Sequence, residues 1–210
     1  MTGILIGPYA VWRATAENPK PDVSFVPPLE RRRLTGVERA AIAVAWQVKT
    51  DADLPVVFAS RWGEIGITLK LMKQFHADGE MSPAGFSSSV HNAAPGAFSL
   101  LTKSHSPYTA IAARERSLES GLLEALAMRR EVIFAYAEES TPELYLPSFG
   151  EPQSACAVAV RIGGSEGRSA AVTFRHADLP AASFDAFAAF LEGHATSFST
   201  SDLRLSRGDV

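Results

Sequence analysis

Apolar residues follow two patterns along this chain, and their alternation predicts an α/β fold. Nearly continuous apolar runs, which are typical of buried strands, occupy residues 3–12, 56–59, 108–112, 131–137 and 155–162. Between them, apolar residues recur every three or four positions, which is typical of amphipathic helices, over residues 35–48, 64–76, 83–101, 117–130 and 183–191. Because strands alternate with helices, we expect a mostly parallel five-stranded sheet with helices on both faces.

Turn-forming residues and caps add detail to this outline. Thr35 and Glu38 have the spacing of a capping box, which predicts the start of a helix. Pro95 and Gly96 predict an interruption of the helical segment in which they lie. The turn sequence Gly-Gly-Ser-Glu-Gly at residues 163–167 predicts that residues 169–175 pair back on the preceding strand as an antiparallel edge hairpin.

Size and composition are those of one globular unit. The chain has 210 residues, of which 46% are hydrophobic and 20% charged, enough to bury a sizeable core. We expect residues 1–176 to form the domain and residues 177–210 to add a helix and a polar, mobile tail from His194. The net charge of −3 argues against binding to nucleic acid or to a membrane surface.

Targeting signals and metal motifs are not found in the sequence. No apolar run approaches the length of about 20 residues that spans a bilayer, and no leader peptide is recognisable, so we expect a cytoplasmic protein. The single cysteine, Cys156, excludes internal disulfides and a thiolate metal cluster. No two histidines have the spacing of a metal site, and no cofactor motif is present.

The most informative segment runs from residue 81 to residue 96, Met-Ser-Pro-Ala-Gly-Phe-Ser-Ser-Ser-Val-His-Asn-Ala-Ala-Pro-Gly. With the strand and the helix that follow it, this segment resembles the N-terminal half of β-ketoacyl synthases, in which that helix starts at a catalytic cysteine. The resemblance covers about residues 3–175 and implies a single half of a thiolase-like fold. The chain beyond it is too short for a second half, which in the family supplies two active-site histidines. A half fold alone is expected to expose apolar surface.

Four shorter motifs narrow the resemblance. They are Arg-Arg-Arg-Leu at 31–34, Ser-Val-His-Asn-Ala-Ala at 89–94, Thr-Ala-Ile-Ala-Ala at 109–113 and Ser-Gly-Leu-Leu-Glu-Ala-Leu at 120–126. Together they are similar to the short ketosynthase-like proteins of aryl polyene gene clusters, which are assigned as chain length factors. This resemblance implies a non-catalytic subunit that forms a heterodimer with a full-length ketosynthase. The pair would elongate a polyene or polyketide chain on an acyl carrier protein.

The catalytic cysteine of the family has no counterpart here. One alignment places Glu115 at its position, and a second alignment, through Ser120 and Gly121, places Leu118 there. Neither residue is a thiol nucleophile. Glu115 also has a structural interpretation, as an acid that complements the dipole at the start of a helix.

The family-like motifs supply candidates for an interface or an acyl tunnel. These residues are Phe86, Ser89, His91, Asn92, Phe98 and Thr109. Ordinary core packing is the alternative for the phenylalanines, and a hydrogen-bonded buried or interface residue is the alternative for the histidine.

Two other functions are compatible with the sequence. A small standalone acyltransferase or thioesterase would use Ser117, Cys156 or His91, although a serine just inside a helix is usually a cap and a lone cysteine in a strand is usually core. A binding module for an acyl carrier protein would use the arginines at 31–33, 114 and 116. Exposed arginines are more often simply solvated.

Overall fold

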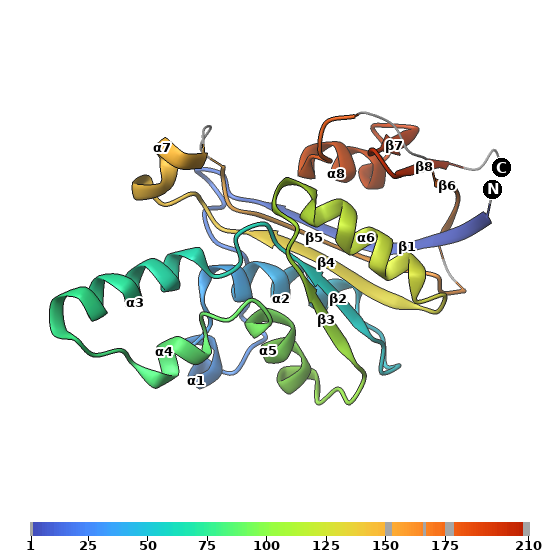
Figure 1. Cartoon of the computed structure of the whole chain (residues 1–210). Coiled ribbons are helices and arrows are strands. Elements are labelled where there is room, and N and C mark those ends of the chain that lie inside the picture. Colours follow the sequence, from blue (N-terminus) through green and yellow to red (C-terminus); the bar gives the residue numbers. More distant parts are fainter. Residues whose placement is uncertain (1, 150–152, 166, 175–178, 208–210) are drawn as a thin grey trace.

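The structure is a computed structural model that describes residues 2–149, 153–165, 167–174 and 179–207. Within these ranges one mixed sheet runs through the molecule (Figure 1) in the order β3-β2-β4-β5-β1-β6-β8-β7. Its strands are β1 (Thr2–Arg13), β2 (Val56–Ala59), β3 (Tyr108–Ile111), β4 (Val132–Glu138), β5 (Cys156–Ile162), β6 (Arg168–Phe174), β7 (Ser197–Ser199) and β8 (Leu203–Arg207). The predicted α/β class and the single sheet flanked by helices are confirmed.

The number and direction of the strands differ from the prediction. The described sheet has eight strands, not five, and only β2 runs parallel to its two neighbours, β3 and β4. The other five pairings are antiparallel. The prediction was wrong because it assumed that a helix connects each strand to the next in a parallel crossover. Instead, β5 returns antiparallel beside β4, the strand that precedes it in the chain.

The first strand explains why the predicted hairpin is also wrong. Residues 156–162 and 168–174 do not pair with each other, because β1 lies between them. The second half of β1 pairs with β5, with Arg13 opposite Cys156, and the first half pairs with β6, with Thr2 opposite Val172. The register shifts between Ile6 and Tyr9, where Pro8 has no N–H to donate to a ladder.

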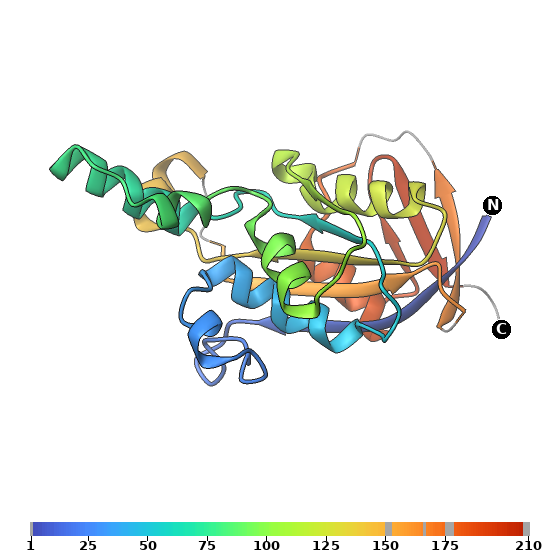
Figure 2. The same cartoon turned by 90° about the horizontal axis from the view of Figure 1, so that it is seen from below.

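Helices cover both faces of the sheet (Figures 1 and 2). The helices α2 (Gly36–Val48) and α5 (Ala93–Thr102) lie on one face, and α6 (Ser117–Ala127) and α8 (Phe184–Glu192) lie on the other. The short helices are α1 (Pro28–Arg31), α4 (Pro83–Ser87), α7 (Leu146–Phe149) and the 3₁₀ turns η1 (Arg114–Arg116) and η2 (Glu143–Tyr145). The helix α3 (Ile65–Asp78) projects from the body of the molecule with α4 beneath it. No helix of the described ranges is long and apolar enough to span a bilayer.

One of two local sequence signals correctly predicts a helix boundary. The predicted capping box at the start of α2 is confirmed, because the Glu38 N–H donates to the Thr35 hydroxyl and the Thr35 N–H donates to the Glu38 carboxylate. The predicted break at Pro95 and Gly96 is wrong: both residues lie inside α5, and the chain is interrupted earlier, between α4 and α5. Proline is tolerated there because the first turn of a helix does not need its N–H groups.

The end of the chain belongs to the sheet. The predicted mobile tail is wrong for residues 195–207, because β8 pairs with β6 and β7 pairs with β8. Phe198, Leu203 and Leu205 are buried in the same core cluster as α6 and α8. The predicted division at residue 176 therefore falls between strands that pair with each other, and residues 175–178 themselves lie outside the described residues.

A buried glutamate holds this C-terminal hairpin on α6. The Glu119 carboxylate accepts hydrogen bonds from the Asp202 N–H, at 2.9 Å, and from the hydroxyls of Thr200 and Ser201. Arg116 adds an ion pair to the same carboxylate. On this face α8, β7 and β8 cover most of the sheet, and Phe174 at the end of β6 stays exposed, as expected for a half fold.

We expect Glu119→Ala to lower the free energy of unfolding by about 3 kcal/mol, because the donors of the hairpin turn lose their buried acceptor. Chemical denaturation measures this. Glu124→Ala, a change at a half-buried glutamate of the same helix, is the control and should stay within about 0.5 kcal/mol. Equal losses in both variants would contradict the role given to Glu119.

Candidate partner interface and nucleophile turn

The strand β3 forms one edge of the sheet. It pairs with β2 on one side, and no described strand pairs with its other side. An unpaired edge presents backbone donors and acceptors that can add a strand from another chain. The backbone groups on this side of β3 are therefore open to pairing with a further strand.

Large apolar side chains on or beside this edge are exposed, and we call them the edge surface: Val90, Leu100 and Tyr108. Leu100 is 83% exposed and Tyr108 is 40% exposed, and such exposed apolar side chains beside an open strand edge often mark an interface. The helix α5 and the strand β3 are in contact, since a Cβ on Gly96 would lie 3.4 Å from the Tyr108 hydroxyl. The chain thus offers apolar contact area beside an open strand edge.

The projecting helix α3 enlarges the exposed apolar area. In the helix predicted over residues 64–76, Ile65, Leu69 and Met72 have the spacing of one apolar face, but Leu71 is the buried residue of α3. Met72 and Phe75 are more than half exposed. The periodicity correctly predicts a helix. Which of the helix's residues are buried depends on what the helix packs against, and α3 projects beyond the sheet (Figure 2).

The histidine of the family-like motif joins this region to the sheet. His91 Nε2 lies 2.9 Å from the carbonyl oxygen of Ile111, at the end of β3. Its ring contacts Phe58 and leaves no room for a side chain at Gly63, where a Cβ would lie 2.6 Å from Nδ1. Gly63 also has a positive φ of 57°. This hydrogen bond therefore gives His91 a structural role: it fixes the segment before α5 against the end of β3.

The other tunnel and interface candidates occupy different environments. Asn92 precedes α5 without capping it, and the Ser89 hydroxyl donates to the carbonyl oxygen of Phe86. Phe98 is buried against the α2 face of the sheet, and Thr109 is half-buried in β3. The structure brings His91, Phe98 and Thr109 to the β3 edge of the sheet, whereas Phe86 lies on α4, which packs against α3.

The turn between β3 and α6 is the place where the family carries its cysteine. Arg114 there has a positive φ of 52°, which is rare for a residue with a side chain. The Ser117 hydroxyl is buried, accepts from the Ala113 N–H at 2.9 Å and donates to the Arg114 carbonyl at 2.7 Å. Ser117 therefore holds the turn together with both of its hydrogen bonds.

Neither position aligned with the cysteine presents a nucleophile. Leu118 is buried in the core, and Glu115 is an exposed residue of η1 that forms an ion pair with Arg61. A hydrogen bond from its own backbone N–H, together with the charge of Arg61, lowers the pKa of Glu115. Glu115 is thus a solvated carboxylate beside an arginine.

The one cysteine lies elsewhere. Cys156 is buried at the start of β5, and two strands, β4 and β2, separate β5 from β3. Burial raises the pKa of its thiol to about 12, so the thiolate is not available at neutral pH.

Buried carboxylates beneath the loop from β2 to α3 were not predicted from the sequence. The Glu138 carboxylate accepts from the backbone N–H groups of Arg61 and Trp62, and Glu139 accepts from that of Gly66. Glu64 is 3% exposed, and neither of its carboxylate oxygens has a partner at hydrogen-bond geometry within the described chain. Charged residues at the end of a buried strand, as in Glu138 and Glu139, were the available signal.

Burial changes the protonation of these groups. It raises the pKa of Glu138 to about 7 and that of Glu64 to about 8. The Thr35 hydroxyl offsets only part of the shift at Glu64, and the charges of Glu38 and Glu139 add to it. Glu64 is therefore a neutral acid at pH 7. Across the described residues, no group of three or more potential ligands is arranged to hold a metal ion.

Comparison with known proteins identifies the family. Residues 9–194 match the model of the β-ketoacyl synthase N-terminal domain. The chain belongs to this family. The predicted resemblance is confirmed, and no curated protein matches the chain.

Solved structures share the fold at low identity. A complex of the ketosynthase ApeO with its chain length factor ApeC, from Xenorhabdus doucetiae, contains a chain with a TM-score of 0.77 and 21% identity; the match covers 99% of this chain and 100% of that one. The type II polyketide complex AntDE:AntF, in which an acyl carrier protein is in complex with its ketosynthase, gives 0.61 and 13% over 78% of this chain and 63% of that one. The ishigamide ketosynthase/chain length factor gives 0.50 and 15% over 65% and 43%. These likenesses support the thiolase-like half fold.

We expect Glu64→Gln to stabilise the protein at pH 8.5 by on the order of 1–3 kcal/mol. The pKa of Glu64 is raised from 4.5 to about 8 on folding, so its contribution is fully present below about pH 4.5 and is lost as the pH rises through 8. Thermal unfolding from pH 4.5 to 9 measures the effect. Glu80→Gln, at an exposed glutamate, should leave the pH profile unchanged, and an unchanged profile in Glu64→Gln would refute the assignment.

Proposed function

We propose that this chain is a non-catalytic chain length factor. It forms a heterodimer with an active, full-length ketosynthase and shapes the pocket in which a polyene or polyketide chain is elongated on an acyl carrier protein. The observation that carries the proposal is the turn between β3 and α6 of this family member. In place of a thiol, this chain has a buried serine, a solvated glutamate and a core leucine there.

The edge of the sheet supports the pairing. The strand β3 is open on one side, and the edge surface around it exposes Leu100 and Tyr108. A partner that adds a strand here would bury both the backbone groups and the apolar side chains. The ApeO–ApeC structure contains a ketosynthase and a chain length factor, and one of its chains matches this chain over its whole length.

Residues next to this edge are suited to contribute to a shared pocket. His91, Asn92 and Thr109 lie at the strand edge or beside it, and Phe98 backs it from the core. A partner joined at β3 would bring its own surface against these side chains. These residues can supply the shape of the pocket and apolar contact area. Catalytic chemistry is not available from Ser117 or His91, because each is held by a structural hydrogen bond.

Contact with the carrier protein is a further part of the proposal. Arg116 is tied to Glu119 and Asp202, so it serves the C-terminal hairpin. The exposed arginines at 32 and 33 are better placed to meet an acidic carrier surface. In the AntDE:AntF complex, an acyl carrier protein is bound to its ketosynthase, which shares the fold of this chain.

The alternative of a standalone acyltransferase or thioesterase has less support. Such an enzyme needs a nucleophile with a base within hydrogen-bond reach. Ser117 donates to the Arg114 carbonyl, and the Cys156 thiol has a pKa raised to about 12. His91 is bonded to a backbone oxygen rather than to either of them.

We expect this chain to co-purify with a co-expressed full-length ketosynthase from the same organism. Leu100→Asp combined with Tyr108→Asp should weaken the pairing at least about 10-fold, because two charges would be buried in the interface. Gel filtration and pull-down measure the pairing. Phe174→Asp, at an exposed phenylalanine of β6 on the far side of the sheet, is the matched control. A monomer that binds no ketosynthase would refute the proposal.

We also expect no covalent acyl adduct on this chain after incubation with acyl thioesters, since it presents no activated nucleophile. Intact-mass spectrometry of the chain alone, and of the chain mixed with the ketosynthase, measures this. An adduct on this chain that Ser117→Ala or Cys156→Ala abolishes would instead establish the enzyme.

A further inference from the structure

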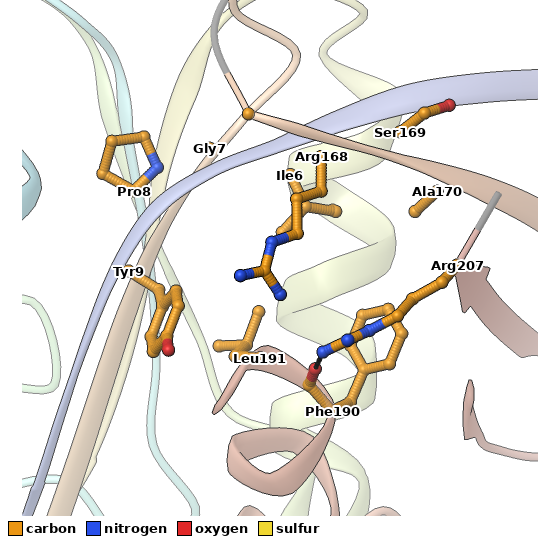
Figure 3. A pocket seen from close by; sticks show the side chains of 11 residues that line it. Ile6, Gly7, Pro8, Tyr9, Arg168, Ser169, Ala170, Phe190, Leu191 and Arg207 are labelled. Carbon is orange, nitrogen blue, oxygen red and sulfur yellow. Dashed lines mark hydrogen bonds between the residues drawn. The ribbon is translucent and has the colours of Figure 1, made fainter. Parts of the chain in front are cut away.

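A pocket with two arginines lies at the end of the sheet away from the edge surface. It has a volume of about 370 Å³ and is bounded by β1, β6, β8 and α8. Its floor is apolar and consists of Ile6, Ala170 and Leu191, all buried. Figure 3 shows Arg168 reaching into the pocket from β6 and Arg207 entering it from β8.

The two guanidinium groups converge. Arg207 Nη2 and Arg168 Nη1 lie 3.2 and 3.8 Å from the point at which Gly193 would carry a Cβ. Arg207 is held in place, because its Nη2 donates to the Phe190 carbonyl at 2.8 Å and its guanidinium lies over the Phe190 ring. Arg168 is exposed and reaches over the floor toward it.

Within the described part of the chain, no acidic side chain lines this pocket. Glu192, which follows the lining residue Leu191, pairs with Arg13 at 3.1 Å. Two like charges held close together repel each other, and an anion between them would remove the repulsion and accept charge-assisted hydrogen bonds.

Two features of the backbone leave the pocket open. The register shift of β1 between Ile6 and Tyr9 interrupts the ladder beside the pocket. Gly193 ends α8 with a positive φ of 94° and carries no side chain, so the space next to both guanidinium groups stays open. The chain thus combines a positioned cation, a second cation and an apolar floor in one concave site.

We propose that this pocket binds a small organic anion. A single carboxylate or phosphate ester lies between Arg168 and Arg207, and an apolar or aromatic body packs on Ile6 and Leu191. The floor favours an organic anion over an inorganic one, because only the former replaces water on the apolar surface. The site is distant from the edge surface, and its occupancy does not depend on the pairing proposed above.

Titration of the complete chain with four probes tests the proposal. The probes are 3-phenylpropanoate, phenyl phosphate, the neutral 3-phenylpropanamide and inorganic phosphate, followed by calorimetry and by NMR. We expect saturable binding of at least one aromatic anion, and at least about 10-fold weaker binding of the amide and of inorganic phosphate. Comparison of the two aromatic anions shows which head group the pocket prefers. Absence of saturable binding for both anions, or equal binding of the amide, would overturn the proposal.

Variants locate the site. Arg168→Gln changes an exposed side chain and should weaken binding of the aromatic anion about 10- to 100-fold. Arg204→Gln, at an exposed arginine of β8, is the matched control and should bind like the unaltered chain. Thermal unfolding confirms that both variants are folded. Unchanged affinity in Arg168→Gln, or an equal loss in Arg204→Gln, would place the anion elsewhere and refute the assignment.

Discussion

The fold depends on one constraint: its central strands are apolar on both faces, so both faces must be covered. In β4, Val132 and Phe134 belong to one core cluster, and Ile133 and Ala135 belong to the other. Every described residue of β4 and β5 is buried. Such strands are stable only between two layers, because exposed apolar area costs about 25 cal/mol per Å². The helices α2 and α5 provide one layer, and the second layer must come from elsewhere in the chain.

The C-terminal segment provides that second layer. The helix α8 and the strands β7 and β8 bring Phe187, Phe198 and Leu205 onto the face that α6 covers only in part. A buried carboxylate, Glu119, fixes the hairpin by accepting its turn donors. This segment covers most of that face, although Phe174 of β6 stays 65% exposed on it. Most of the other large exposed apolar side chains lie on or beside β3, α3, α4 and α5.

This distribution separates two kinds of surface. Near β3 the chain offers an open strand edge and apolar side chains, while the adjoining turn is closed by the hydrogen bonds of Ser117. At the opposite end, Arg168 and Arg207 converge over an apolar floor. The first surface suits another protein and the second a small anion. Neither has the paired nucleophile and base that covalent acyl transfer requires.

The sequence by itself determined several of the elements and the family. Periodicity and caps predicted α2, α6 and β4 within a few residues, and the motif around His91 indicated the β-ketoacyl synthase family, because both signals are local. Only the tertiary structure decided that β1 separates β5 from β6, that residues 195–207 join the sheet, and that the Glu64 carboxylate is buried. It also decided that Met72 is exposed and that Arg168 meets Arg207. These facts depend on contacts between segments far apart along the chain, and no local pattern of residues specifies which distant strand or side chain will lie opposite.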